Sequence, residues 1–335
     1  MTACDGFYAV AMQPAASIER RWGVLAAAAV ATLLISLGVG AVDISISELA
    51  RILLGGGEPI ARSVVLELRL PRALAAMAVG GALAVAGLLL QALFRNPLAD
   101  PYVLGVSGGA SVGALLALAA GGGAVAVQAG ATTGAVLAGA CVFLIGARLG
   151  ASQLLLAGVV VASACGAAVT LLLSLVGSEQ LRGMLFWLAG DLSQAREPLL
   201  PLFIAAVAAL VASLAGTPLN VLAAGDLRAA AVGLDVRKWR ILVFLAAAGL
   251  TAIAVVVAGT IGFVGLMGAH GARLLLSSSD HRQLAPATML LGGTFVAIAD
   301  LLARTVLEPR QLPVGAVMAL LGAPLFILLL RRVSR

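Results

Sequence analysis

The segment 69–113, RLPRALAAMAVGGALAVAGLLLQALFRNPLADPYVLGVSGGASVG, contains two apolar runs separated by a short polar turn. The first run, 73–93, is uncharged and long enough to cross a hydrocarbon core of about 30 Å, which requires about 20 helical residues. Pro71 suits the first turn of such a helix, because its missing N–H would have no partner there. The turn NPLADP (96–101) then interrupts the apolar sequence. The segment therefore predicts two membrane-spanning helices and the connection between them.

The rest of the chain has the same character. Apolar residues make up 62% of the 335 residues and charged residues 11%, whereas soluble proteins average about 45–50% and about 25%. This composition predicts an all-α, polytopic membrane protein that forms a single transmembrane domain over residues 1–335. We expect ten helices, at about 22–42, 73–93, 103–120, 124–147, 153–176, 199–215, 240–258, 260–276, 284–303 and 312–330.

The distribution of charge predicts the orientation of these helices. An even number of crossings places both termini on one side, and a cytoplasmic assignment puts 13 of the 21 Arg and Lys residues on the inner face. That bias agrees with the positive-inside rule. Residues 1–21 then form a cytoplasmic N-terminal segment without a cleavable signal, and the net charge of +6 reflects topology rather than nucleic-acid binding.

Two arginines lie where a cation is not expected. Arg69 and Arg72 precede the second predicted helix on its outer side, against the positive-inside trend and at the positive end of the helix dipole. They should therefore require an anionic partner. Glu67 within the chain is one candidate, and an acidic external protein is the other.

The longest inner connection is TPLNVLAAGDLRAAAVGLDVRKWR (217–240). Asp226 is expected to cap a short helix that Gly233 ends. The segment 217–239 can be interpreted as a docking element for a cytoplasmic protein, or equally as an interfacial loop with snorkelling cations.

The sequence lacks the residue patterns that several kinds of catalytic, phosphate-binding or metal site require. The sequence has no GxxxxGK[ST] phosphate loop and no HExxH pattern. Its two histidines are too few for a metal cage, and its three cysteines predict neither a disulfide nor a metal cluster. We expect no catalytic residue, no bound metal and no cofactor on this chain. A proton- or sodium-coupled carrier is the alternative, but such carriers need ionisable groups near the midplane.

Six blocks of sequence together resemble the FecCD family, the ten-helix permeases of ABC importers for heme, ferric siderophores and cobalamin. The blocks are the segment 69–113 quoted above, LLLAGVVVAS (154–163), FWLAGDLS (186–193), AAGDLRAAAVGLDV (223–236), GTIGFVGLMGAHGARLL (259–275) and ADLLAR…LPVGAVMALLGAPLFILLL (299–330). One departure is Ala269-His270, where the family usually has Pro-His.

The resemblance implies the partners and their sites. It implies a homodimer in the bacterial inner membrane, two cytoplasmic ATPase subunits that use ATP and Mg, and a periplasmic substrate-binding protein. The residues implied in docking of the binding protein are Arg69, Arg72 and Arg304. Those implied in coupling to the ATPase are Gly225, Asp226, Leu227, Arg228 and Ala229, and those implied in an inner gate are Asn96, Leu98, Gly150 and Ala151.

The substrate is less well defined by the resemblance. The FWLAGDL block, with Asp191 after glycine, is closer to heme-type members than to siderophore members, where serine is common. We therefore expect an iron chelate, with heme favoured over a ferric siderophore and cobalamin as the alternative.

Overall fold

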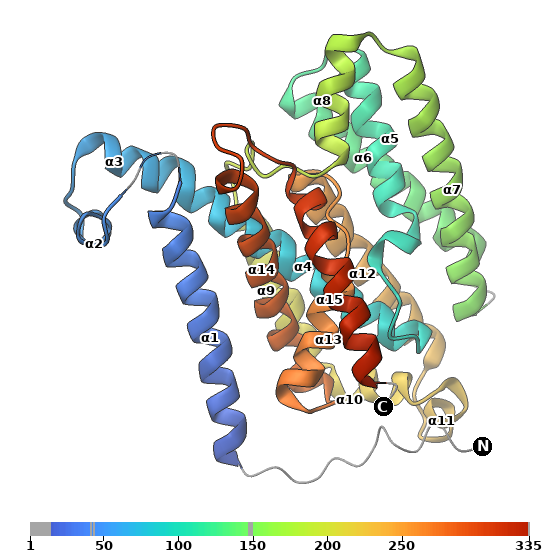
Figure 1. Cartoon of the computed structure of the whole chain (residues 1–335). Coiled ribbons are helices and arrows are strands. Elements are labelled where there is room, and N and C mark those ends of the chain that lie inside the picture. The colour runs from blue at the N-terminus through green and yellow to red at the C-terminus, as the bar shows by residue number, and fades with distance from the viewer. Residues whose placement is uncertain (1–14, 41, 43, 147–149, 334–335) are drawn as a thin grey trace.

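The computed structural model describes residues 15–40, 42, 44–146 and 150–333, and this part of the chain is helical without strands (Figure 1). The predicted segment 1–21 falls largely outside the described residues, as does Cys4. The long helices are α1 (Ala15–Gly38), α4 (Leu70–Phe94), α5 (Val106–Ala119), α6 (Ala124–Gly146), α7 (Ala151–Leu175), α9 (Leu199–Leu214), α12 (Val236–Ala258), α13 (Val264–Leu276), α14 (His281–Thr305) and α15 (Val314–Val333).

Each of the ten predicted segments therefore contains a helix, with ends displaced by up to seven residues. Within the described part of the chain, six helices, or seven if the bent pair Leu199–Leu214 and Gly216–Ala223 is one span, are long and apolar enough to cross a membrane. Three more apolar helices, α5, α13 and the Val314–Leu328 part of α15, are shorter than this criterion requires. The ten crossings themselves stay a prediction.

Shorter helices in the connections were not predicted from the sequence. They are α2 (Ile46–Leu53), α3 (Pro59–Ser63), the π-helix η2 (Val64–Arg69), the 3-10 helix η3 (Pro101–Leu104), α8 (Ser178–Leu188) and α10 (Gly216–Ala223). The predicted short helix of the inner connection exists as α11 (Asp226–Ala231). Most of these helices contain too few residues for a clear apolar period, so the sequence pattern does not reveal them.

Pro71 stands in the first turn of α4, as predicted, but no separate helix begins there, because α3, η2 and α4 form one helical stretch from Pro59 to Phe94. Pro71 cannot donate the usual backbone hydrogen bond to the preceding turn. The π-helical turn over Val64–Arg69 lies directly before it and is a geometry that accommodates such a local break. The helix thus continues through the proline rather than beginning there.

Helix α4 is the centre of the bundle. In its most apolar window 94% of the residues are buried, and it is packed against α9, α12, α13 and α14. Close approach depends on glycine: a Cβ atom on Gly80 would overlap the carbonyl oxygen of Gly292 in α14, and one on Gly87 would lie 2.5 Å from the Cα of Gly265 in α13. The same device joins α5 to α6, where a Cβ on Gly113 would overlap the carbonyl oxygen of Gly130, as is typical of closely packed membrane helices.

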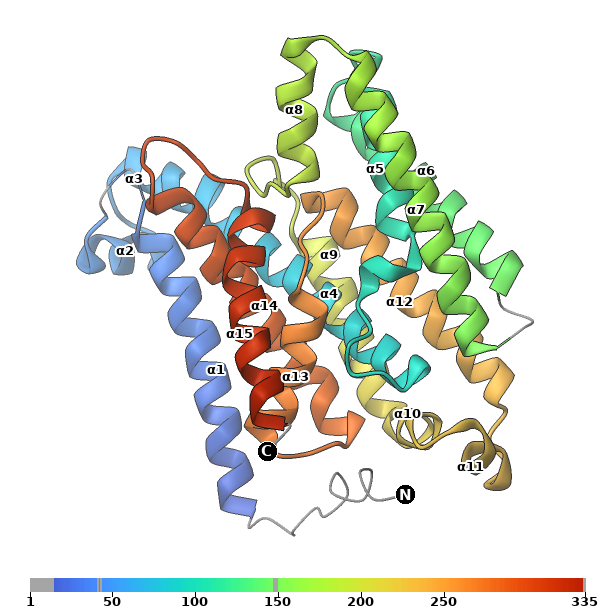
Figure 2. The same ribbon diagram turned by 45° about the vertical axis from the view of Figure 1, so that its right-hand side comes forward.

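The two ends of the bundle carry different elements. Figures 1 and 2 show α2, α3 and α8 at one end, and α10, α11 and the end of α15 at the other. Arg69 and Asp226 therefore lie at opposite ends of the molecule, as the predicted topology requires.

Candidate functional site

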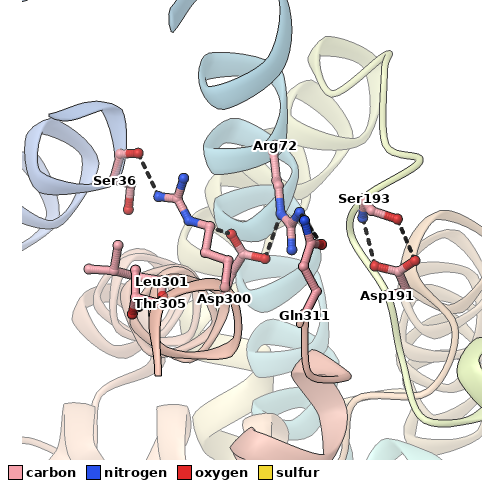
Figure 3. Close-up of polar contacts among 9 residues, drawn as sticks. Ser36, Arg72, Asp191, Ser193, Asp300, Leu301, Thr305 and Gln311 are labelled. Carbon is pink, nitrogen blue, oxygen red and sulfur yellow. Dashed lines mark hydrogen bonds and ion pairs between the residues drawn. The ribbon is translucent and has the colours of Figure 1, made fainter. Parts of the chain in front are cut away.

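At the α2–α8 end, one buried carboxylate joins two of the predicted docking arginines (Figure 3). Asp300, only 2% exposed, projects from the last turns of α14. Its Oδ1 accepts a hydrogen bond from Nε of Arg72 at 2.8 Å, and its Oδ2 lies 3.8 Å from Nε of Arg304. Arg72 also donates to Oε1 of Gln311 at 3.0 Å, and Arg304 to the Ser36 carbonyl at 2.5 Å. The cluster fastens α1, α4 and α14 together.

Arg69 makes a separate connection to α1. It is 6% exposed, and its guanidinium donates to the carbonyl oxygens of Leu37, Gly38 and Val42 at 2.8, 2.8 and 2.6 Å. Carbonyls at a helix C-terminus lack partners within the helix, so Arg69 closes the end of α1. A Cβ on Gly40, whose φ is +152°, would lie 2.9 Å from this guanidinium.

The structure shows which anionic group within the chain pairs with Arg72. Within the chain Arg72 pairs with Asp300 rather than with Glu67, which is exposed. Sequence reasoning missed Asp300 because it lies 228 residues from Arg72; the available signal was a carboxylate in an otherwise apolar helix. The docking role of the three arginines stays a prediction.

A cleft of about 440 Å³ opens at the same end, between α5, α6, α8 and the end of α12. Its lining combines aromatic and polar side chains, including Gln128, Phe186, Trp187, Asp191 and Gln194. The Asp191 carboxylate accepts hydrogen bonds from the backbone N–H and hydroxyl of Ser193 at 2.8 and 2.5 Å. The volume lies within the range of small-molecule pockets.

At the opposite end, the predicted coupling residues form α11 and its approach. Gly225 has a φ of +115° and stands as the N-cap residue without a side-chain cap. Asp226 is the first helical residue and does not cap the helix as predicted. Its Oδ2 instead accepts from Arg240 at 3.1 Å and lies 3.7 Å from Nη2 of Arg95. Gly233, with a φ of +81°, follows the helix end as expected.

The other coupling residues divide by exposure. Leu227 is 89% exposed and Arg228 is exposed, whereas Ala229 is buried. Val232, which follows α11, is 70% exposed as well, so two apolar side chains are uncovered at this end.

The predicted gate residues lie on two segments. Asn96 and Leu98 form the turn after α4, in which Oδ1 of Asn96 accepts from the backbone N–H of Leu98 at 2.9 Å. Gly150, with a φ of +131°, and Ala151 begin α7. Helix η3, which follows the turn, is packed against α7, with Val103 and Leu104 next to Gly158. The gating role of the two segments stays a prediction.

Asp100 ends the same turn and has a perturbed acidity. Its Oδ1 accepts from the backbone N–H of Tyr102 at 3.0 Å, while its Oδ2 is buried without a hydrogen-bond partner. Burial raises the pKa of Asp100 to about 6, and the hydrogen bond from Tyr102 opposes that rise.

Arg95 was not predicted as a functional residue. It ends α4 in a left-handed conformation, with a φ of 52°. A Cβ on Gly225 would lie 3.4 Å from its Nη1, so the guanidinium lies over the approach to α11. Its position directly before the 96–98 turn was the signal that the sequence offered.

Among the residues that the structure describes, no group of three or more His, Cys, Asp or Glu side chains could hold a metal ion. Cys141 and Cys165 are free thiols.

A glycine-packed bundle of apolar helices, with a ligand-sized cleft at one end and an exposed short helix at the other, is the architecture of a polytopic membrane protein. A model of the FecCD transport family matches residues 28–332. The chain belongs to the FecCD family and is a FecCD-type permease of an ABC importer. The resemblance found in the sequence is thereby confirmed.

Relatives and a solved structure agree with this assignment. The chain is 37% identical over 325 residues to the uncharacterized ABC transporter permease protein YvrB of Bacillus subtilis, covering 91% of both chains. It is 41% identical to the vitamin B12 import system permease protein BtuC of Klebsiella pneumoniae, over 79% of this chain and 82% of the relative. A metal-chelate type ABC transporter in an inward-facing conformation superposes with a TM-score of 0.85 at 30% identity, over 94% of this chain and 99% of the other.

Proposed function

We propose that this chain is the membrane-spanning subunit of an ATP-driven importer that moves a metal chelate from the periplasm to the cytoplasm across the bacterial inner membrane. The observation that carries the proposal is the family match over residues 28–332 on a fold whose two ends bear different potential contact surfaces. The ten helices cross the membrane with both termini in the cytoplasm.

The chain works as a homodimer with two cytoplasmic ATPase subunits and a periplasmic binding protein. ATP and Mg act on the ATPase subunits, and no cofactor is held by the permease. The binding protein docks at the α2–α8 end, where Arg72 and Arg304 share the Asp300 carboxylate and Arg69 binds the carbonyls at the end of α1. Acidic side chains on a docked protein would add to that neutralisation.

The α11 end transmits ATP-driven movement inward. Leu227 and Arg228 supply an exposed contact, while Asp226 connects α11 to α12 through Arg240 and to α4 through Arg95. Since Arg95 directly precedes the turn with Asn96 and Leu98, movement of α11 reaches the gate by a short path. Gly150 and Ala151 form the facing part of that gate.

Cobalamin is the first substrate to test. The 41% identity to a vitamin B12 permease over most of both chains supports it more strongly than the FWLAGDL block supports heme. The Asp191 carboxylate of that block is bonded to Ser193, which supplies a local reason for its presence that involves no substrate. Heme and a ferric siderophore are the other candidate substrates to be tested.

The cleft beneath α8 is proposed to form part of the substrate path. Trp187 and Phe186 offer flat apolar surface, and Gln128 and Gln194 offer hydrogen bonds, which suits the rim of a large chelate.

The decisive experiment is uptake by vesicles reconstituted with this chain, its ATPase and its binding protein. We expect accumulation of one chelate that requires internal ATP and persists without an ion gradient. Cobalamin, heme and a ferric siderophore are offered separately on the loaded binding protein. Accumulation driven by a proton gradient without ATP would instead establish a secondary carrier.

A further inference from the structure

Helix α2 has more apolar surface than the protein covers. On the side turned toward α1, Leu49 and Ile52 are 7% and 2% exposed. On the adjoining side Ile46, Ala50 and Leu53 recur at the spacing i, i+4, i+7, and Ile46 and Leu53 are 88% and 50% exposed. The remaining side is polar and consists of Ser47, Glu48 and Arg51. Helical geometry thus gives α2 an apolar side of which only part is buried.

The helix that follows repeats this arrangement. Ile60 and Leu68 lie two turns apart and are 71% and 66% exposed, beside the buried Ala61 and Val65. Leu54, in the turn between α2 and α3, is 88% exposed. Six exposed residues form the apolar stripes: Ile46, Ala50, Leu53, Leu54, Ile60 and Leu68.

The stripes cannot turn inward, because polar contacts fix α2 and α3. Ser45 caps α2 by accepting from the backbone N–H of Glu48 at 3.2 Å. The Glu48 carboxylate pairs with Arg51 at 2.5 Å and accepts from the backbone N–H of Glu58 at 2.7 Å. Arg62 donates to the Gly55 carbonyl at 3.2 Å. These bonds hold the stripes on the outside of the molecule.

The position of α2 and α3 indicates what lies against them. Both views show α2 beside the end of α1, on the side away from α14 (Figures 1 and 2). Along α1 the exposed apolar residues Val30, Ile35 and Val39 lead toward this end, and α1 is long and apolar enough to span a membrane. An apolar exterior on a membrane span meets acyl chains, so the stripes continue a lipid-facing surface.

The length of the next helical stretch indicates how deep in the membrane α3 lies. The helical stretch Pro59–Phe94 has 36 residues, which is about 54 Å at 1.5 Å per residue, against a hydrocarbon core of about 30 Å. Part of that stretch must therefore lie in or beyond the headgroup layer unless it is strongly tilted. Helix α3 forms the beginning of this stretch, at the predicted outer connection between the first two spans. The polar contacts described above join it to α2.

We propose that α2 and α3 lie in the interfacial layer of the outer leaflet, with the apolar stripes among the upper acyl chains and with Ser47 and Arg51 toward water. The inference rests on the proposed function, in which α1 and α4 cross the membrane. Within residues 44–68 three glutamates accompany two arginines, so attraction to anionic lipid is not the driving force. The driving force is the burial of apolar area, as in other interfacial helices.

Spin-label accessibility tests this placement on the intact chain. Single cysteines replace residues 46, 47, 50, 51, 53 and 60 in a background whose three native cysteines are alanine, and the labelled proteins are placed in phosphatidylcholine nanodiscs. Oxygen concentrates in lipid, whereas a nickel chelate stays in water. We expect the ratio of oxygen to nickel accessibility to be several-fold higher at 46, 50, 53 and 60 than at 47 and 51. Replacing part of the phosphatidylcholine with phosphatidylglycerol should leave this ratio unchanged.

Two matched controls separate this inference from the proposed function. A label at Val30 on α1 should report lipid, and a label at Leu227, which is 89% exposed at the α11 end, should report water. If Val30 reports lipid while positions 53 and 60 match Leu227, the interfacial placement is overturned and the membrane assignment stands. If positions 53 and 60 are closed to both reagents, a protein surface covers the stripes and the inference is likewise overturned. If Val30 itself reports water, the membrane placement of α1 fails first.

Discussion

At the scale of single residues, the polar groups of this protein occupy positions that bind helices together. Asp300, Arg72 and Arg304 connect α14 to α4 and α1, and Arg69 closes the end of α1. Such charges are costly away from water unless they are paired. Their presence in a chain that is only 11% charged indicates that each has a specific partner.

Asp300→Ala should destabilise the protein more than any exposed acidic substitution. Without this carboxylate the guanidinium groups of Arg72 and Arg304 lose their shared counter-charge, and breaking a buried pair costs about 3–5 kcal/mol. Asp300→Asn should cost less, because the amide oxygen can still accept from Arg72. Thermal unfolding in detergent measures both, with the exposed Glu197→Gln as the control, for which a change within about 0.5 kcal/mol is expected. Equal stability of Asp300→Ala and the control would show that the cluster contributes nothing.

Asp100 should make stability depend on pH. Its folded-state pKa of about 6 lies above the ordinary value of 3.8, so the folded protein favours the protonated acid. Its contribution is complete below about pH 4 and is lost as the pH rises through 6. Asp100→Asn keeps an acceptor for the Tyr102 N–H and should therefore be more stable than the native chain at pH 7. Its free energy of unfolding should also change less between pH 4 and 7 than that of the native chain. Parallel profiles for the two proteins would contradict the assignment.

At the scale of elements, close helix contacts depend on particular glycines. Helix α4 meets α14 at Gly80 and Gly292, where no Cβ atom fits. Backbones that approach this closely gain contact along the whole crossing, so these positions determine how tightly the central helix is held.

Gly80→Ala and Gly249→Ala should have opposite effects. A methyl group at Gly80 overlaps the backbone of α14, and overpacking costs about 1–3 kcal/mol. Gly249 in α12 has no neighbour within 4 Å of its ideal Cβ position, so alanine there should gain about 0.5–1 kcal/mol from lower backbone entropy. Chemical unfolding of the two variants provides the comparison, and a loss of stability in both would mean that helix separation is not the cause.

The sequence predicted the long helices well and the connections poorly. Apolar runs such as 73–93 are bounded by charges, so their existence follows from composition. Helices α2 and α8 were missed, since short amphipathic helices resemble loops when only charge boundaries are used. The Asp300 cluster was missed for another reason: pairing between α4 and α14 is a tertiary property, and no local pattern carries it.

At the scale of the whole molecule, the two ends are connected through α4. Its first turn holds Arg72, which pairs with Asp300, and its last residues adjoin Arg95, which lies 3.7 Å from Asp226 on α11. A helix buried along most of its length behaves as a rigid element. Helix α4 therefore connects the predicted docking surface to the predicted coupling surface.

Asp226→Asn should weaken the link between ATP hydrolysis and transport. Loss of the charge releases α11 from Arg95 and Arg240, so part of its movement no longer reaches α4. In the reconstituted importer we expect a several-fold fall in substrate moved per ATP hydrolysed, with assembly intact. Arg237→Ala, at an exposed cation of the same segment, should retain the native ratio. An unchanged ratio for Asp226→Asn would show that the coupling does not pass through this carboxylate.

The central place of α4 also has a consequence for biosynthesis. Its packing partners α9, α12, α13 and α14 all lie later in the chain, and the last of them ends at Thr305. At about 5–20 residues per second, ribosomes complete that partner roughly ten to forty seconds after α4 emerges. During this interval α4 must wait beside the insertion machinery or in lipid with its glycine faces uncovered. A chain that stalls before α14 would leave that helix available to the wrong neighbour or to a membrane protease.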